Sequence, residues 1–249
     1  MVTDRRDDDS RGIGAARFAT TQWSLVLAAG EGSSATSRDA LAELCQTYWS
    51  PVYAFIRRRG KPVHDAQDLT QEFFTRLLEK NTVAVARPER GRFRSFLLTA
   101  VKNFLAGEWK KDAAQKRGGD RAVLSLDFDS AEGRYSHEPA HELTAEQLYE
   151  RRWAESLLDH IVERLHDEYV RDGKQQQFDV LKFSITAGEA VSHKDAAAKL
   201  AVSENAVAVA VHRLRKRYRH LLRAEIAETV DGPDEVDDEI RRLMETLGT

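Results

Sequence analysis

His137, Glu138 and His141 have the spacing of the HExxH string, in which two histidines one helical turn apart bind zinc and the glutamate acts as a general base. That chemistry needs a continuous helix. Pro139 stands inside the string, where it removes a backbone donor and clashes with the preceding turn. The segment also lies in an acidic stretch without an evident third ligand, so we expect it to bind no metal.

Other enzymatic chemistry has no sequence signal either. The chain has no P-loop, no glycine-rich phosphate cradle after a strand, and no grouping of serine, histidine and aspartate that would indicate a catalytic triad. The single cysteine, Cys45, stands among Leu41, Leu44 and Tyr48, where a buried structural thiol is expected rather than a nucleophile. We therefore predict a protein that is not an enzyme and that uses no cofactor.

The charges of the chain are segregated. Its net charge over 249 residues is only −3, which argues against a generic nucleic-acid coat protein. Six Lys or Arg and no acid occur in residues 212–223, and six Lys or Arg against three acids occur in residues 102–121. Acids dominate residues 127–150 and 225–249. Two basic patches with acidic connectors are consistent with contact to nucleic acid at two points.

The first 20 residues are polar and contain few apolar side chains, so we expect a disordered tail. They lack the apolar core of a secretory signal, and no later stretch suggests a membrane span. We therefore expect a cytoplasmic protein without membrane insertion.

Helical periodicity of the apolar residues predicts an all-α protein, with only a weak strand-like alternation at residues 123–128. In the first half of the chain it predicts helices near residues 21–27 and over residues 37–56, 65–80 and 93–109. Pro51 predicts either a kink in the second of these or a new helix capped by Ser50. Residues 21–112 are thus expected to form one helical domain.

Residues 113–145 form the longest stretch without helical periodicity, and we interpret them as a flexible acidic linker. Helix resumes after Thr144, which is a capping residue with Gln147 at the third helical position. Residues 146–231 are expected to form a second helical domain. Residues 232–249 are an acidic tail, for which a frayed terminus is expected, although residues 235–247 could form a short amphipathic helix.

Residues 192–223 have the pattern of a helix-turn-helix. Ser192 is a natural cap for a helix from His193 to Leu200, and Ser203 can cap a second helix after a short turn. The second helix carries one apolar stripe, Val207, Val211, Leu214, Tyr218 and Leu221. Its opposite side would meet a DNA major groove, although an ordinary amphipathic helical hairpin gives the same pattern.

Three segments in this order resemble a bacterial RNA polymerase sigma factor of the sigma-70 family, of the extracytoplasmic-function type. The first two are DAQDLTQEFFTRLLEK, similar to the region 2.2 helix of that family, and RGRFRSFLLTAVKNFLAGEWKK, similar to its region 2.3 and 2.4 helix. The third is the helix-turn-helix of residues 192–223, similar to region 4. The resemblance covers roughly residues 40–112 and 148–225, and it implies core RNA polymerase and promoter DNA as partners. It leaves an anti-sigma factor open as a further partner.

The resemblance also implies which residues form each interface. A helix with exposed acids, an amide and one uncovered aromatic ring would bind the coiled-coil clamp of the polymerase large subunit through Asp65, Asp68, Gln71, Glu72 and Phe74. The downstream promoter element would be held as single-stranded DNA, with the loop of residues 82–92 closing over Asn103. The residues expected there are Arg90, Arg92, Arg94, Lys102, Asn103, Lys110 and Lys111. The upstream element would be duplex DNA, contacted by Ser203, Glu204, Asn205, Ala208, His212, Arg213, Arg215 and Lys216.

The sequence departs from the family in its second helix, which reads Glu204-Asn-Ala-Val-Ala-Val-Ala-Val, with basic residues only from Arg213 onward. Each missing phosphate contact lowers the affinity for DNA, so we expect weak binding of the upstream element by this domain alone. Two alternatives to a sigma factor therefore stay open. One is a helix-turn-helix regulator that works without polymerase, and the other is a sigma-like helical interaction protein with weak DNA reading.

Overall fold

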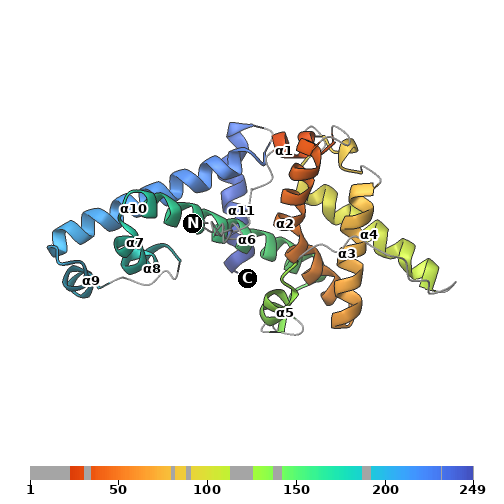
Figure 1. The fold of residues 1–249 in the computed structure, drawn as a ribbon, viewed down its shortest axis with the longest axis horizontal. Helices are drawn as coiled ribbons and strands as arrows, with labels where there is room; N and C mark the ends of the chain where they lie inside the picture. Colours follow the sequence, from red (N-terminus) through yellow and green to blue (C-terminus); the bar gives the residue numbers. More distant parts are fainter. Residues whose placement is uncertain are drawn as a thin grey trace, which may run out of the picture.

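The computed structural model describes residues 23–30, 35–79, 82–87, 91–112, 126–136, 142–186, 192–230 and 232–248. Within these ranges the protein contains α-helices and short 3-10 turns and no strand, as the periodicity predicts. Helices α1 to α5 lie at one end of the molecule and α7 to α9 at the other, with α6, α10 and α11 between them (Figure 1). None of the helices described is both long enough and apolar enough to span a bilayer.

Helix α2 (Ala35–Arg58) is the centre of the first half of the molecule. It packs against α1 (Trp23–Gly30), α3 (Val63–Glu79) and α6, so that Tyr48, Val52 and Ile56 are fully buried. One helix continues through Pro51, so of the two predicted alternatives the new helix capped by Ser50 does not occur. A proline in a helix interior loses one backbone hydrogen bond. Burial of this segment on several sides holds the helix together across it.

Helix α4 (Phe93–Asp112) completes this half and contacts α3 through aromatic side chains. The rings of Phe73 on α3 and Phe104 on α4 are 5.6 Å apart, and Tyr48 on α2 meets Phe93 edge to face at 5.4 Å. Between α3 and α4 the chain forms a 3-10 turn, η1 (Thr82–Val85), which packs against α1 and α3. The apolar side chains predicted for residues 65–80 and 93–109 thus face one shared core.

Part of the predicted linker is a helix, α5 (Phe128–Ser136), docked on α2. The Phe128 ring lies 5.4 Å from Trp49 and 5.3 Å from Tyr53. The prediction of a flexible linker over all of residues 113–145 is therefore wrong for residues 128–136. Their helical signal is weak because α5 is short and buries few of its own residues, and the rings of α2 stabilise it.

Helix α6 (Ala145–Arg171) belongs to both halves of the molecule. The predicted capping box at its start is confirmed, since Thr144 accepts from the Gln147 backbone and the Gln147 side chain accepts from the Thr144 backbone. A helix of 27 residues is about 40 Å long. It packs on α2, on α7 (Gln175–Leu181) and on α10, so the boundary predicted at residue 146 falls in the first turn of a helix that contacts both halves.

The second half contains the predicted helix pair. Helix α9 (His193–Leu200) has the bounds expected from its sequence, and α10 (Glu204–Ala227) follows after a turn. A short helix, α8 (Phe183–Thr186), precedes the pair and contacts α10. The stripe expected on α10 is confirmed, with Val207, Val211, Leu214 and Leu221 buried and Tyr218 half-buried.

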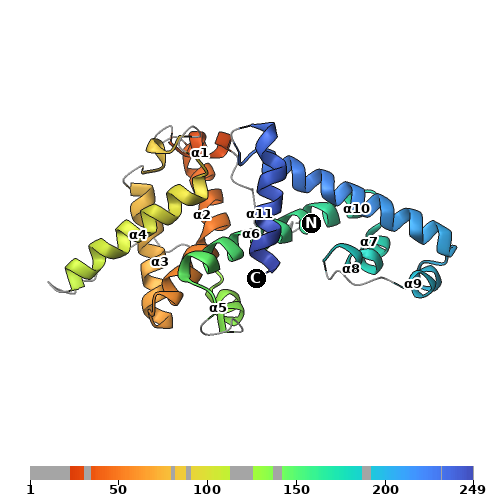
Figure 2. The same ribbon diagram turned by 180° about the vertical axis from the view of Figure 1, so that it is seen from behind.

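The C-terminal residues form a 3-10 turn, η3 (Pro233–Glu235), and a helix, α11 (Val236–Gly248), that crosses the junction of the two halves. Helix α11 packs against α6 and α10 (Figure 2). Its residues Val236 and Leu243 are buried. The expected frayed terminus is wrong for the residues described, and the alternative of an amphipathic helix over residues 235–247 is confirmed. The packing of α11 helps to join both halves into one continuous apolar core.

Candidate polymerase and nucleic-acid interfaces

Helix α3 presents two carboxylates to solvent. Asp65 lies in its first turn and Asp68 one turn later, and both side chains are exposed. Acids at a helix N-terminus are stabilised by the helix dipole, so this position holds negative charge at little cost. Gln71 is half-buried on the next turn. The structure thus places Asp65, Asp68 and Gln71 close together along the exposed side of the N-terminal half of α3.

Glu72 differs from these residues because its side chain is largely covered. It forms an ion pair with Arg76, and the same guanidinium donates to Glu108 on α4 at 2.6 Å. Arg76 also lies over the Phe104 ring, 5.0 Å from its centre. Glu72 therefore belongs to a network between α3 and α4 and presents little of its carboxylate to a partner.

Phe74 corrects the prediction of an uncovered aromatic ring on α3. Its side chain is 1% exposed and its ring meets that of Phe73 edge to face at 5.2 Å. Helix α3 packs on α2, the Phe73 ring also meets Phe104 on α4, and both successive phenylalanines are buried. A single apolar stripe per helix, as assumed from the sequence, leaves the second of them outside.

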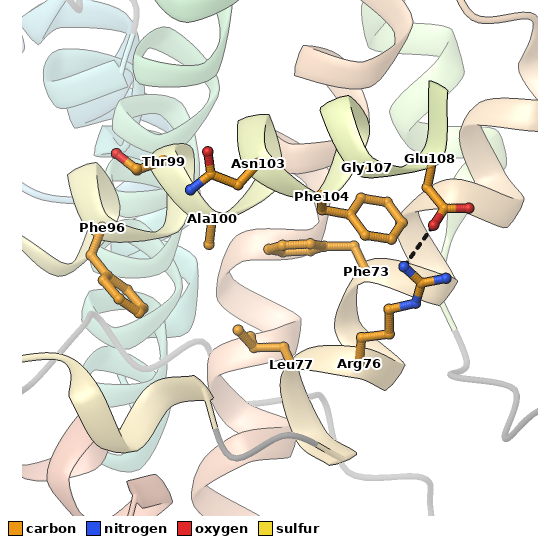
Figure 3. A pocket seen from close by; sticks show the side chains of 10 residues that line it. All are labelled: Phe73, Arg76, Leu77, Phe96, Thr99, Ala100, Asn103, Phe104, Gly107 and Glu108. Carbon is orange, nitrogen blue, oxygen red and sulfur yellow. Dashed lines mark hydrogen bonds and ion pairs between the residues drawn. The ribbon is translucent and has the colours of Figure 1, made fainter. Parts of the chain in front are cut away.

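A groove of about 410 Å³ lies between α3 and α4 (Figure 3). Phe73 and Leu77 form its α3 side, and Phe96 and Phe104 lie on its α4 side. Asn103 and Thr99 are exposed and lie side by side along α4 at its rim, as Figure 3 shows. An apolar floor with one amide at the edge has the character of a small-ligand pocket, and its volume lies in the usual range of about 300–1,000 Å³.

The loop expected to close over Asn103 does not line this groove in the part of it that the structure describes. The lining side chains come from α3 and α4, whereas η1 packs on α1. Arg90 lies outside the described residues, and of Lys110 and Lys111 only the helical backbone is described. Lys102 is 44% exposed and forms an ion pair with Glu146 at 2.8 Å. An exposed pair of this kind contributes little to stability, so Lys102 can exchange Glu146 for another anion.

Arg94 corrects a second prediction, because it is not accessible to DNA in this conformation. Its side chain is buried, and it binds Glu150 at 2.8 Å and lies 4.0 Å from the ring centre of Trp153. It also forms an ion pair with Glu239 on α11. Burial lowers the pKa of Arg94, but the two carboxylates outweigh burial and leave the pKa raised. The arginine is therefore charged, and its contacts stabilise the packing of α4 against α6 and α11.

Arg92 is partly accessible and pairs with the same Glu239 at 2.5 Å. Burial and the neighbouring charge of Arg94 lower the pKa of Arg92, against the opposing effect of Glu239. Two of the residues expected to contact phosphates thus converge on one carboxylate of the C-terminal helix. Sequence reasoning missed this contact, since nothing in the local pattern of residues 232–249 indicates where α11 docks.

The helix pair α9 and α10 has the capping geometry of a helix-turn-helix. Ser192 accepts from the Asp195 backbone at 3.3 Å and Ser203 accepts from the Ala206 backbone at 3.2 Å, so each helix is capped by its predicted serine. The turn between them contains Ala201 in the left-handed conformation, with φ of 53°. The two serine caps are confirmed, while a DNA-binding helix-turn-helix stays a prediction.

The residues predicted for the upstream element do not all share one side of α10. Glu204, Asn205, His212 and Lys216 are exposed, Ala208 is half-buried, and Ser203 is used as the cap. Arg215 is exposed, but its Nε donates to the Ser184 carbonyl at 3.1 Å. At about 100° per residue, Arg213 points well away from His212. It lines a separate cleft with Tyr169 and Asp172 of α6 and its C-cap.

Comparison with known families gives a match within the first half of the molecule. Residues 44–114 match the family model described as Sigma-70 region 2. Residues 44–114 are thus similar to sigma-70 region 2, and we call them the region 2-like segment. The match includes most of α2 together with α3, η1 and α4. Neither the curated proteins nor the solved structures gave a match.

The region 2-like segment is extended by α5, which sequence reasoning did not assign to it. Arg57 on α2 binds Glu132 on α5 through two hydrogen bonds of 2.9 and 2.7 Å, and Tyr53 donates to the same carboxylate at 2.6 Å. Arg57 also lies 4.7 Å from the ring centre of Tyr135. Residues 128–136 are thus fixed to the region 2-like segment by polar and aromatic contacts, and only parts of the predicted linker are left to connect it to α6.

Proposed function

We propose that this protein is a sigma factor of the extracytoplasmic-function type, which binds core RNA polymerase and directs promoter recognition, DNA melting and transcription initiation. The observation that carries the proposal is the match of residues 44–114 to sigma-70 region 2. Within that region, exposed carboxylates on α3 and an apolar groove edged by Asn103 on α4 have the chemistry expected of the two contacts. The protein acts as a specificity subunit in the cytoplasm and is not itself an enzyme.

In this proposal Asp65, Asp68 and Gln71 bind a basic helix of the polymerase large subunit. Carboxylates at the rim of an interface chiefly raise the association rate and select the partner. Asn103 and the α3–α4 groove hold an unstacked base of the downstream element, because an apolar slot can accept a base and an amide can pair with its edge. Lys102 neutralises a nearby phosphate.

The helix pair α9 and α10 is proposed to contact the duplex upstream element. The N-terminus of α10 and Asn205 are the first contacts, with His212, Arg215 and Lys216 next to phosphates. The low charge of the first turns makes this contact weak by itself. Attachment of region 2 to polymerase raises the effective concentration of the helix pair at the promoter, so weak intrinsic affinity is sufficient.

The test is transcription by the full chain with core RNA polymerase on a library of random promoters. We expect co-elution with core polymerase and run-off products that share an upstream and a downstream element. The double variant Asp65→Lys with Asp68→Lys is expected to lose both co-elution and the run-off products. Asp39→Lys, which reverses an exposed acid on α2, is the matched control. Failure of the unaltered chain to co-elute and to support any transcript would refute the proposal.

A second candidate, a helix-turn-helix regulator that works without polymerase, is favoured by the capped geometry of α9 and α10. It predicts tight and sequence-selective binding of duplex DNA by the full chain alone. It also predicts that charge reversal at Asp65 and Asp68 leaves that binding unchanged. A selection of duplex sequences against the full chain, with and without polymerase, separates the two functions.

A further inference from the structure

The C-terminal helix α11 places a buried carboxylate at the start of α4. Glu239 is fully buried and lies within ion-pair distance of both Arg92 and Arg94. A buried carboxylate is costly unless a positive charge compensates it, so the position of α11 depends on these two arginines. We call Arg92, Arg94 and Glu239 the α4–α11 cluster.

The contact in this cluster resembles the contact that an arginine makes with a phosphate. A guanidinium binds a carboxylate and a phosphate through the same donors, so each anion excludes the other from a given arginine. Each carboxylate oxygen of Glu239 lies next to one guanidinium, Oε2 next to Arg92 and Oε1 next to Arg94. A competing anion at Arg92 therefore has to displace one of these two contacts.

We propose that α11 is an intramolecular competitor of nucleic acid, which occupies Arg92 in the closed protein and leaves α4 when a DNA strand binds there. The proposal rests on the proposed function, since the competing anion is the phosphate backbone of the downstream element. Glu239 stands in for one phosphate, and the closed protein is an inhibited state of region 2.

The two arginines have different roles in the opening step. Arg94 keeps Glu150 and the ring of Trp153 when α11 leaves, so it stays in the core. Arg92 loses the carboxylate to which it is paired and becomes available to a phosphate. Undocking also exposes Val236 and Leu243, which favours the closed state until an anion or a partner compensates.

Distance measurement between two spin labels tests the opening directly. Asp39→Cys on α2 and Met244→Cys on α11 replace exposed residues that do not line the α3–α4 groove. Cys45 can stay, because it is buried and burial raises the pKa of its thiol to about 12, so that it does not react with the label. On saturation with a random-sequence single-stranded DNA oligonucleotide, we expect a longer and broader distance distribution.

Binding of the same oligonucleotide tests the competition. Glu239→Gln is expected to bind it roughly three- to tenfold more tightly than the unaltered chain, as one additional charge-assisted contact implies. Its salt dependence should steepen by about 0.7 in logarithmic slope for the one phosphate gained. Glu239→Asp retains the charge, and Glu245→Gln removes an exposed carboxylate of the same helix. Both variants should therefore bind the oligonucleotide with about the affinity of the unaltered chain.

The inference is overturned if the label distance stays constant in saturating DNA, or if Glu239→Gln binds no more tightly than Glu245→Gln. If Glu239→Gln does not fold, the label distance in the chain with native Glu239 decides alone. Failure of the proposed function gives a different result. The chain would then support no transcription with core polymerase, while the label distance would still lengthen and Glu239→Gln would still bind DNA more tightly. Transcription that is unaffected by Glu239→Gln, together with a constant distance, refutes the inference and leaves the function intact.

Discussion

Arg57 and Glu132 form a bidentate ion pair that fixes helix α5 to α2, although the two residues are 75 positions apart in the sequence. Both side chains are mostly covered, and Tyr53 donates a third hydrogen bond to the same carboxylate. Bidentate pairs of this type are among the stronger polar contacts in proteins because both donors are fixed by the planar guanidinium. The pair makes part of the acidic segment that follows the region 2-like segment an integral part of its surface.

Removal of either partner is expected to destabilise this contact. For Glu132→Gln we expect the free energy of unfolding to fall by about 1–3 kcal/mol, since a charge-assisted contact is lost and Arg57 remains partly buried. Denaturation in urea, followed by circular dichroism, measures the change. Asp129→Asn, an exposed acid on the same helix, is the control and should change the value by less than about 0.5 kcal/mol.

The pH dependence of stability should show opposite contributions from two carboxyl groups. The hydrogen bond from Arg57 lowers the pKa of Glu132 below 4.5, although burial opposes it. Its folded pKa thus lies below the unfolded value, so its stabilisation is present above about pH 4.5 and is lost as the pH falls through the folded pKa.

Burial raises the pKa of Glu225 above 4.5, against the opposing effect of Arg164. The folded protein then favours the neutral acid, so stability is lost as the pH rises from 4.5 through the folded pKa. Compared with the unaltered chain, Glu132→Gln should therefore flatten the acid limb of a stability profile, and Glu225→Gln should remove the loss at higher pH. If both substitutions changed the pH dependence of stability in the same direction, this assignment would be contradicted.

The helices of this protein could be predicted from the sequence because their signals are local. The serine caps of α9 and α10 and the capping box at Thr144 each involve residues three apart, and all three are observed. The apolar stripe of α10 follows from helical spacing alone. The resemblance of residues 44–114 to region 2 is recognisable for the same reason, since its motifs lie within continuous helices.

The contacts between helices could not be predicted in this way. Arg94 has the charge of a phosphate ligand, but its environment is set by Glu150, Trp153 and Glu239, which lie far away in sequence. Helix α5 has little periodicity of its own and depends on the aromatic side chains of α2. Burial of a charged or polar residue depends on long-range packing, which a pattern of neighbouring residues does not contain.

Phe74 gives a direct test of that difference. Because its ring is buried between helices, Phe74→Ala is expected to lower the free energy of unfolding by about 3–5 kcal/mol. An exposed ring that only contacted a partner would change stability by less than about 0.5 kcal/mol. Val85→Ala, at a 56% exposed apolar position, is the control for loss of an apolar side chain. Thermal and urea unfolding of the isolated chain measure both variants.

The turn between α9 and α10 should be improved by glycine. Ala201 has a φ of 53°, a conformation that costs a residue with a Cβ about 1–2 kcal/mol. Ala201→Gly removes this cost and adds some entropy to the unfolded chain, so we expect a net gain of up to about 1 kcal/mol. Ala198→Gly, at an exposed position inside α9, should instead lose about 1 kcal/mol. If Ala201→Gly and Ala198→Gly both lowered the free energy of unfolding, the turn would not be strained.

Asn103 tests the proposed role of the α3–α4 groove in the region 2-like segment. The side chain is exposed at the rim, so Asn103→Ala should change the free energy of unfolding by less than about 0.5 kcal/mol. If its amide pairs with the edge of an unstacked base, the same variant should weaken capture of the melted strand by about 1–3 kcal/mol. Permanganate reactivity of promoter thymines in the presence of core polymerase measures the melted state. Ser95→Ala, also exposed on α4 but not among the residues that line the groove, should leave that reactivity unchanged. Equal melting by Asn103→Ala and Ser95→Ala would remove Asn103 from the DNA interface and leave its groove without an assigned ligand.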